Sequence, residues 1–362
     1  MPLLLVAFSV SALAALLLLR STRSRAYSGD TDLHGPQKFH ARSVPRAGGV
    51  ALMMGLLAAA IALLSQDVAE PAVGLWLVAC SLPAFAAGLA EDITKRISPR
   101  RRLLATALSA ALAVWLLDVA INRTDLPGLD TLVAYPAGAL AVTMFVVAGV
   151  ANSFNIIDGF NGLASMCGML ILLTVAYVAF QANDALVVLL ALGSVGAVLG
   201  FFVWNYPAGL IFLGDGGAYL LGFYAAELCI LLLHRNAQVS PMFPLLVCIY
   251  PVFETLFTIY RRRFVRKSPT GLADGIHLHS LVYRRLVRWA VGDRSNLALT
   301  RRNSLTSPYL WALCLVSLVP AMLWWDSTPI LGACVVGFGI AYCTLYWRIV
   351  RFRAPRWMVL RR

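Results

Sequence analysis

Long apolar stretches recur along the whole chain, and they constrain its fold more than any other feature of the sequence. Crossing a bilayer takes about 20 apolar residues, and the 362 residues contain about eleven stretches of this kind. Hydrophobic residues make up 60% of the chain and charged residues 13%, against about 45–50% and about 25% in a water-soluble domain. The sequence therefore predicts an all-α polytopic membrane protein with about eleven transmembrane helices. These begin near Pro2, Ala47, Pro71, Leu103, Thr131, Leu163, Asp184, Phe212, Pro241, Tyr309 and Pro329.

Positive charges are spread unevenly over the connections between the predicted helices. Basic residues accumulate in short cytoplasmic loops because they resist translocation. With a periplasmic N-terminus, 28 of the 30 Lys and Arg residues fall on the cytoplasmic side, and Arg123 and Arg235 fall outside. The basic segments are 20–46, 91–102, 261–308 and 348–362. We therefore expect one integral membrane domain over 1–362, with a cytoplasmic C-terminal tail and a long cytoplasmic loop whose part 280–291 forms an amphipathic helix.

Acidic and amide side chains at the cytoplasmic ends of the predicted helices are the first candidates for chemistry, because charge at membrane depth is costly. Glu91 and Asp92 close the third predicted helix. Asn152, Asn155 and Asp158 recur every three residues at the end of the fifth, so on a helix they would share one face. Their oxygen atoms can hold a hard cation or bind a nucleobase. The alternative for Glu91 and Asp92 is an ion-paired helix end. The alternative for the segment that contains Asn152, Asn155 and Asp158 is a glycine-rich turn between helices.

The glycine-rich segment 212–217 stands at the start of the eighth predicted helix, and free N–H groups at a helix start favour phosphate. Asp215 beside them could bring a metal ion. Further along, His277 and His279 alternate in a segment that we expect to be extended, so they would point to the same side. Two histidines without cysteine make a poor zinc site, which favours contacts to phosphate. The alternative is a surface pair without function.

The segment before the second predicted helix is basic and contains Lys38, His40, Arg42 and Arg46. These residues either contact a lipid phosphate or simply keep the loop in the cytoplasm. The predicted topology places this segment and the four other motifs on the cytoplasmic face. Together they offer acids, amides, cations and helix starts, which suit metal-assisted phosphate chemistry at a membrane surface.

In combination, these motifs resemble the polyprenyl-phosphate N-acetylhexosamine-1-phosphate transferases of glycosyltransferase family 4. That family includes the lipid-linked peptidoglycan precursor enzyme and the enzymes that initiate O-antigen and teichoic acid synthesis. The resemblance covers about residues 32–285. The matching segments are Asp32–Gly49 (first cytoplasmic loop), Glu91-Asp92 (Asp-Asp pair), Asn152–Leu163 (NxxNxxDGxDGL), Phe212–Gly217 (F-x-GD-small-small) and His277–His279 (histidine motif).

Four positions depart from the family pattern. Glu91 replaces the first Asp of the pair, and Asn161 replaces the second Asp of the DGxDG core. Glu254 stands where many members have Asp, and Ser280 follows the two histidines where a third often occurs. These substitutions point away from the peptidoglycan enzyme and toward the branch that initiates surface polysaccharides, and they leave the sugar open.

The resemblance implies transfer of a sugar 1-phosphate from a UDP-N-acetylhexosamine to undecaprenyl phosphate, giving undecaprenyl-diphospho-sugar and UMP. It implies Mg²⁺ as cofactor, with Mn²⁺ as an alternative ion, and a place in the bacterial inner membrane at the start of O-antigen or other surface-polysaccharide synthesis. The expected partners are the two substrates and the lipid bilayer, and a homodimer is compatible with this picture. No basic run is interleaved with aromatic residues, so we expect no nucleic acid partner.

The resemblance also implies a role for each motif residue. Metal ligation falls to Asp215 and Asn155. Catalytic roles fall to Asp92, Glu91 and Asp158. Substrate binding falls to Asn152, Asn161, Lys38, His40, His277 and His279.

A polytopic transporter is the main alternative, since about eleven helices fit one equally well. Transport predicts ionisable residues near the bilayer midplane, at the interface of two repeats. The motif acids instead lie at one predicted membrane face, and no internal repeat is visible. Glu227, deep in the eighth predicted helix, is the exception, and we expect it to make a hydrogen-bonded contact between helices.

Overall fold

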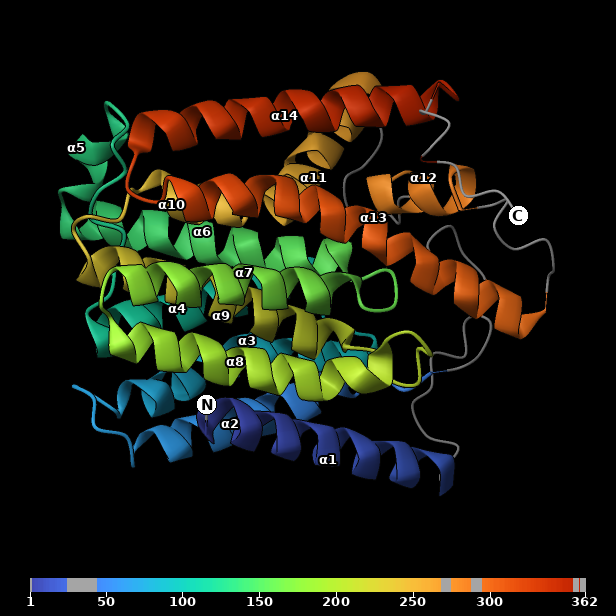
Figure 1. Cartoon of the computed structure of the whole chain (residues 1–362), viewed down its shortest axis with the longest axis horizontal. Coiled ribbons are helices and arrows are strands. Elements are labelled where there is room, and N and C mark those ends of the chain that lie inside the picture. Colours follow the sequence, from blue (N-terminus) through green and yellow to red (C-terminus); the bar gives the residue numbers. More distant parts are fainter. Residues whose placement is uncertain (1, 25–43, 268–274, 288–294, 354–357, 359–362) are drawn as a thin grey trace.

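The structure, a computed structural model, describes the chain except for residues 1, 25–43, 268–274, 288–294, 354–357 and 359–362. The described part forms fourteen α-helices and one π-helical turn. Most of the long helices lie side by side along one common direction (Figure 1). The helices are α1 (Pro2–Ser24), α2 (Gly48–Leu63), α3 (Val73–Thr94), α4 (Pro99–Leu117), α5 (Leu129–Val133), α6 (Pro136–Ile157), α7 (Leu163–Gln181), α8 (Ala185–Asn205), α9 (Gly214–Arg235), α10 (Met242–Val247), α11 (Ile249–Tyr260), the π turn η1 (Arg261–Val265), α12 (Leu278–Arg285), α13 (Asn296–Leu323) and α14 (Thr328–Val350).

Eight helices among the described residues are long and apolar enough to cross a membrane, so the chain is a polytopic membrane protein. They are α1, α3, α6, α7, α8, α9, α13 and α14. The other three predicted spans fall on elements of different character. The apolar helix α2 has 16 residues, α4 begins with three arginines, and the stretch after Pro241 is divided between α10 and α11. The count of eleven and the orientation therefore stay predictions.

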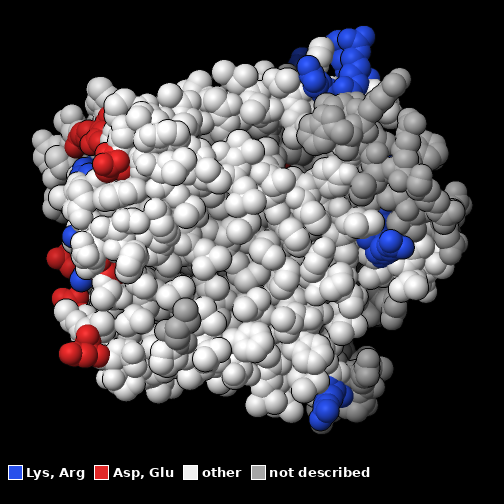
Figure 2. Space-filling model, in the orientation of Figure 1, with Lys and Arg blue, Asp and Glu red and all other residues white. Residues whose placement is uncertain are grey.

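Charged side chains gather at two opposite ends of the molecule and leave an uncharged belt between them (Figure 2). Lys and Arg predominate at the end where α6 joins α7, and Asp and Glu predominate at the other end. A membrane protein is expected to separate charge in this way, with the basic end in the cytoplasm. The belt is the surface that the acyl chains would cover.

Helix α9 lies at the centre of the bundle. Its whole apolar stretch is buried, and it packs against α2, α3, α6 and α7. Apart from Asp215, Glu227 and the terminal His234 and Arg235, its residues are apolar, aromatic or small on every side, which is typical of a helix surrounded by protein. An added methyl group at Gly222 would lie only 2.5 Å from the Cα atom of Ala151 on α6. Small residues give membrane helices the close contact that replaces a hydrophobic driving force.

The first turn of α9 is held by glycine contacts from two neighbouring helices. A methyl group at Gly88 on α3 would lie 2.6 Å from the Cα atom of Gly216. A methyl group at Gly49 on α2 would collide with the backbone nitrogen of Gly217. Because backbone cannot move aside as a flexible side chain can, only glycine fits these positions. The contacts fix where the N-terminus of α9 lies.

Backbone hydrogen bonds tie the start of α2 to the segment that precedes α9. The Gly48 N–H donates to the Phe212 carbonyl at 2.9 Å, and the Phe212 N–H donates to the Pro45 carbonyl at 2.9 Å. Arg46 lies between these two bonds in the sequence. The pairing therefore delivers Arg46 to the same end of the molecule as the first turn of α9.

The predicted loop 261–308 is helical over much of its length, which corrects the sequence-based expectation. Helix α13 begins at Asn296 rather than near Tyr309. Ser295 caps it, since its side chain accepts the Ala298 N–H at 3.3 Å. Hydropathy misses this extension because it contains many polar residues, although several of them are buried in the protein, namely Asn303, Ser304, Thr306 and Ser307. Helix α12 overlaps the predicted amphipathic segment over residues 280–285 and begins two residues before it, and residues 288–294 lie outside the described part.

Gly88→Ala tests the contact between α3 and α9. The added methyl group would force two backbones apart, so we expect the free energy of unfolding to fall by about 1–3 kcal/mol. Thermal unfolding in detergent would show a lower midpoint. Gly149→Ala on α6 is the matched control, because nothing lies within 4 Å of its added methyl group and alanine favours a helix by roughly 0.5–1 kcal/mol. Equal midpoints for the two variants would contradict the close packing.

Candidate functional site

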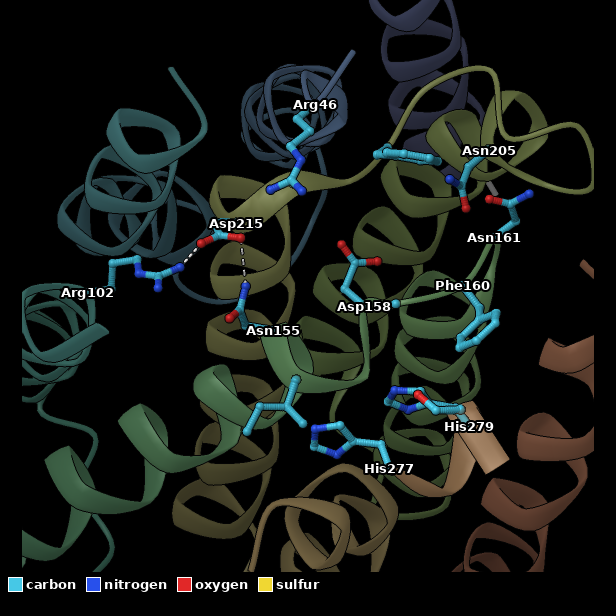
Figure 3. Close-up of a pocket in the computed structure, with 15 residues that line it drawn as sticks. Arg46, Arg102, Asn155, Asp158, Phe160, Asn161, Asn205, Asp215, His277 and His279 are labelled. Carbon is cyan, nitrogen blue, oxygen red and sulfur yellow. Dashed lines mark hydrogen bonds and ion pairs between the residues drawn. The ribbon is translucent and has the colours of Figure 1, made fainter. Parts of the chain in front are cut away.

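A pocket of about 340 Å³ lies at the end of the molecule where α6 ends and α9 begins (Figure 3). Six separate parts of the chain line it, from the segment just before α2 to the start of α12. Its lining residues are Arg46, Arg102, Asn155, Ile156, Asp158, Gly159, Phe160, Asn161, Asn205, Phe212, Gly214, Asp215, His277, His279 and Ser280. Basic, acidic and amide groups thus face one another at the end of the bundle.

The structure brings several of the predicted site residues together and separates others. Those that line the pocket are Asn155, Asp158, Asn161, Asp215, His277 and His279. Asp92, Glu91 and Asn152 are absent from the lining. Lys38 and His40 lie outside the described residues. The functional roles of all these residues stay predictions.

Asp215 occupies the first turn of α9 and has polar partners on two other helices. The Asn155 side-chain amide on α6 donates to its Oδ1 at 3.0 Å, and Arg102 on α4 forms an ion pair with its Oδ2. Figure 3 shows both contacts as dashed lines. The Arg102 guanidinium also lies over the Tyr219 ring, 5.6 Å from its centroid. Asp215 is therefore a largely buried carboxylate in a positive environment, since the helix N-terminus adds to the charge of Arg102.

Asp92 lies directly behind the pocket wall, at the start of α9. Its Oδ2 accepts the Gly216 N–H at 2.9 Å, and its buried Oδ1 has no hydrogen-bond partner among the described residues. Gly214 forms the wall with φ of +73°, and a methyl group there would lie 2.6 Å from Asp92 Oδ2. The neighbouring Glu91 turns away, because its Oε2 accepts the Ile97 N–H at 2.7 Å. Glu91 thus secures the turn that follows α3.

The expected helical stripe of Asn152, Asn155 and Asp158 is divided, which corrects the sequence analysis. Helix α6 ends at Ile157, and Asp158 has non-helical angles of φ −76° and ψ 57°. Asn152 faces α9, where its Oδ1 accepts the Tyr219 hydroxyl at 3.1 Å. Since Asp158 has left the helix, its side chain can point into the middle of the pocket (Figure 3).

The pKa of Asp158 is raised to about 7. The main cause is burial, which penalises the charged form. The positive charge of Arg46 opposes the rise, and the negative charge of Asp92 adds to it. Asp158 therefore changes its charge close to neutral pH, inside a pocket that is otherwise rich in fixed charges.

Asn161 is buried and ties the turn after α6 to the rest of the protein. Its backbone N–H donates to Asn303 Oδ1 at 2.8 Å. Its side-chain amide donates to the Pro207 carbonyl at 3.3 Å and to Ser304 Oγ at 3.1 Å. Its backbone carbonyl accepts the Ser307 hydroxyl at 2.6 Å. The contact with the Pro207 carbonyl needs a donor, so an amide rather than a carboxylate suits this position.

The sequence analysis missed several residues that shape the pocket. Asn205 holds the turn from its other side, because its Oδ1 accepts the Gly162 N–H at 2.6 Å. Arg102 belongs to a run of three arginines, and it differs from exposed Arg100 and Arg101 only in facing the bundle. The run itself was visible, but nothing in it marked one member. Helical periodicity could have distinguished Arg102 from Arg100 and Arg101 only if the inward face of α4 had been known.

His277 and His279 do not lie in an extended segment as predicted, because α12 begins at Leu278. His277 precedes its first turn and His279 belongs to it, and the two rings stack with centroids 5.0 Å apart and an interplanar angle of 17°. Both side chains are buried. The surface position assumed by the alternative is therefore wrong, the predicted common side of the two rings is confirmed, and the function of the pair stays a prediction.

The residues of the pocket fit a hard divalent cation such as Mg²⁺. This ion takes oxygen ligands and is usually held by one or two carboxylates together with substrate phosphates and waters. Asp215 offers a carboxylate, and Asn155 offers an amide oxygen once its amide rotates away from the present contact. The described residues contain no group of three or more His, Cys, Asp or Glu that could hold a metal. Phosphate oxygens of a substrate would therefore complete the coordination.

Comparison with known proteins gives a consistent picture. Residues 74–233 match the family described as Glycosyl transferase family 4. Over 299 residues, 81% of this chain and 80% of the relative, the chain is 26% identical to a probable undecaprenyl-phosphate N-acetylglucosaminyl 1-phosphate transferase of Bacillus subtilis. It is 27% identical over 258 residues, 70% and 72% of the chains, to an undecaprenyl-phosphate alpha-N-acetylglucosaminyl 1-phosphate transferase of Thermotoga maritima. It is 26% identical over 286 residues, 73% and 84%, to a phospho-N-acetylmuramoyl-pentapeptide-transferase of Rubrobacter xylanophilus.

Asn161→Asp tests the structural demand at the turn, although it restores the residue typical of the family motif. The carboxylate would face the Pro207 carbonyl without a donor, so we expect a loss of about 3 kcal/mol in unfolding free energy. Burial would raise the pKa of the new acid, so the folded state would bind more protons than the unfolded state and stability would fall as pH rises. Thermal unfolding at pH 5 and pH 8 measures this trend. Asn183→Asp, at an exposed position after α7, should show neither effect, and a wild-type midpoint for Asn161→Asp would refute the argument.

Proposed function

The chain belongs to glycosyl transferase family 4, and from this premise we propose that it transfers an N-acetylhexosamine 1-phosphate from a UDP-sugar to undecaprenyl phosphate. The products would be undecaprenyl-diphospho-sugar and UMP. One observation carries the proposal: Asp215 and Asp158 share a pocket with Arg46 and Arg102 at the basic end of the bundle. Such a site can bind phosphates at the membrane surface while a polyprenyl chain stays in lipid.

The reaction must bring together two anions, a lipid phosphate and a nucleotide diphosphate. At 4 Å, two unit charges repel by about 4 kcal/mol at an effective dielectric constant of 20. Arg46 and Arg102 supply fixed positive charge on the pocket wall, and the start of α9 adds the positive end of a helix dipole. A Mg²⁺ ion held by Asp215 and Asn155 would neutralise charge on the diphosphate. Binding by these groups makes the approach of the nucleophile feasible.

Asp92 is our candidate for orienting the acceptor phosphate. One of its oxygens secures the Gly216 N–H, and the other has no partner among the described residues. A phosphate monoester has its second pKa near 6, so most of the nucleophile is already ionised at pH 7. A general base is therefore dispensable, and Glu91 has an indirect part, through its bond to Ile97.

The donor would bind along the turn after α6 and against α12. Asp158 points into the pocket from that turn, and His277 and His279 face it from the other side (Figure 3). Asn161 holds the turn in place. Two of the relatives are named for N-acetylglucosamine, so we propose UDP-N-acetylglucosamine as the donor. The product would start O-antigen or another surface polysaccharide at the bacterial inner membrane.

One observation supports the transporter alternative. Glu227 in the middle of α9 is buried, and neither of its carboxylate oxygens has a hydrogen-bond partner among the described residues. The expected contact between helices is therefore absent there. A single buried acid does not form a transport path, whereas Asp158 and Asp215 share one pocket.

Release of UMP tests the proposed reaction directly. Purified protein in detergent would receive undecaprenyl phosphate and a panel of UDP-N-acetylhexosamines, with Mg²⁺, Mn²⁺ or EDTA. We expect release that depends on lipid and metal, and a fall of at least about 100-fold in Asp215→Asn. Asp67→Asn, an exposed acid between α2 and α3, is the control and should keep full activity. Well-folded protein that releases no UMP from any donor would refute the reaction, and transport assays would follow.

Asp158 should impose a pH dependence on nucleotide binding. Its pKa of about 7 leaves it mostly neutral at pH 6 and mostly ionised at pH 8. The ionised form repels a diphosphate, whereas the side-chain amide of the Asp158→Asn variant stays neutral throughout. The affinity of wild type for UDP in EDTA, relative to this variant, should therefore fall by up to about tenfold from pH 6 to pH 8. Calorimetry at both pH values measures the ratio, and a constant ratio would contradict the assignment.

A further inference from the structure

A buried carboxylate behind the histidines receives hydrogen bonds from two other helices. Glu254 on α11 is fully buried. Its Oε1 lies 3.0 Å from His277 Nδ1 and accepts the Leu278 N–H at 3.1 Å. Its Oε2 accepts the Tyr342 hydroxyl at 2.6 Å. Tyr342 lies on α14, far beyond the residues 74–233 that match the family.

These bonds determine which nitrogen of His277 faces the pocket. A carboxylate that accepts several hydrogen bonds is favoured in its ionised form. Ionised Glu254 only accepts, so His277 Nδ1 must carry a proton and donate it. Thr258 Oγ1 lies 3.2 Å from the same nitrogen, where it can accept the same N–H as a second acceptor. Because His277 lines the pocket, its Nε2 is the atom left for a ligand.

Of the two histidines, His277 is the one that contacts Glu254. His279 stacks on it, with the ring centroids 5.0 Å apart. Nε2 of His279 lies 3.5 Å from the position of a methyl group on Gly159.

Other charged and titratable groups surround this pair. Arg261 at the end of α11 and Tyr346 on α14 both bond to the Ile276 carbonyl, at 3.0 Å and 3.2 Å. Arg46, Arg102, Asp158 and Asp215 face the histidines across the pocket. Of the three acids Asp158, Asp215 and Glu254, it is Glu254 that makes a hydrogen bond to a histidine.

We propose that Glu254 and Tyr342 are positioning residues, which hold His277 so that its Nε2 points at the phosphate groups of a bound nucleotide. Helix α14 is then a working part of the site rather than an outer cover. The nature of the ligand rests on the proposed function, whereas the hold on His277 does not. Such a support resembles the carboxylate that orients the imidazole of a catalytic triad.

Tyr342 allows this role to be tested by removing one oxygen atom. Its ring packs against Phe253, Phe257 and Phe338 at centroid distances of 5.0, 5.4 and 6.4 Å. Phenylalanine would therefore keep the packing and lose only the bond to Glu254. Tyr250, one turn before Glu254 on α11, is the matched control. It is also fully buried, and its hydroxyl has no hydrogen-bond partner among the described residues.

The experiment compares Tyr342→Phe with Tyr250→Phe in the full-length protein in detergent. The first readout is the tautomer of His277, from the nitrogen NMR shifts of isotope-labelled histidine without substrate, with the signal assigned through His277→Gln. The second is UDP affinity by calorimetry. We expect Tyr342→Phe to lower the fraction of His277 protonated at Nδ1 and to weaken UDP binding about three- to tenfold. Tyr250→Phe should change neither, and Glu254→Gln should act in the same direction as Tyr342→Phe but more strongly.

A double variant shows whether the effect passes through His277. In the His277→Gln background, Tyr342→Phe should cause no further loss of UDP affinity, because the two residues act in series. A loss that persists in that background would overturn the proposal, and so would a His277 tautomer that is the same in wild type and Tyr342→Phe. If the tautomer changes but wild type does not bind UDP, the positioning role stands and the proposed function fails.

Discussion

The close backbone contact at the first turn of α9 is the constraint on which the rest of the site depends. Gly88 and Gly49 let α3 and α2 approach this turn to a distance that no side chain would allow. Inside a membrane, helices gain little from excluding water, so such packing has to supply the association. It also places Asp215 next to Gly216, whose N–H donates to Asp92, within one small volume. The geometry of the pocket is therefore a consequence of glycine packing.

The pocket concentrates charge where the surrounding medium is poorly polar. Arg102 and Asp215 satisfy each other, and Asp158 is kept partly neutral by burial. An arrangement of this kind is stable without substrate because most charges have partners, and it can exchange those partners for phosphate oxygens. The basic end of the bundle and the uncharged belt would place such an exchange at a membrane surface (Figure 2).

The C-terminal helices support the site from outside the region that the family match covers. Asn303 on α13 holds the turn that carries Asp158, and Tyr342 on α14 contacts the acid behind His277. Such supporting contacts fix the direction of a functional side chain as firmly as its own helix does. The matched core thus supplies acids and glycines, and the later helices determine how the turn and the histidines are presented.

The sequence by itself determined the helical membrane character and the motifs that meet in the pocket, because hydropathy and short motifs are local properties of the chain. It predicted Asn155, Asp158, Asn161, Asp215 and both histidines as site residues, and the structure brings them together. Tertiary structure alone decided that Asp158 leaves its helix, that Arg102 rather than its neighbours faces Asp215, and that Tyr342 reaches Glu254. These outcomes depend on how helices rotate and pack against distant partners, and no spacing within one segment encodes that contact.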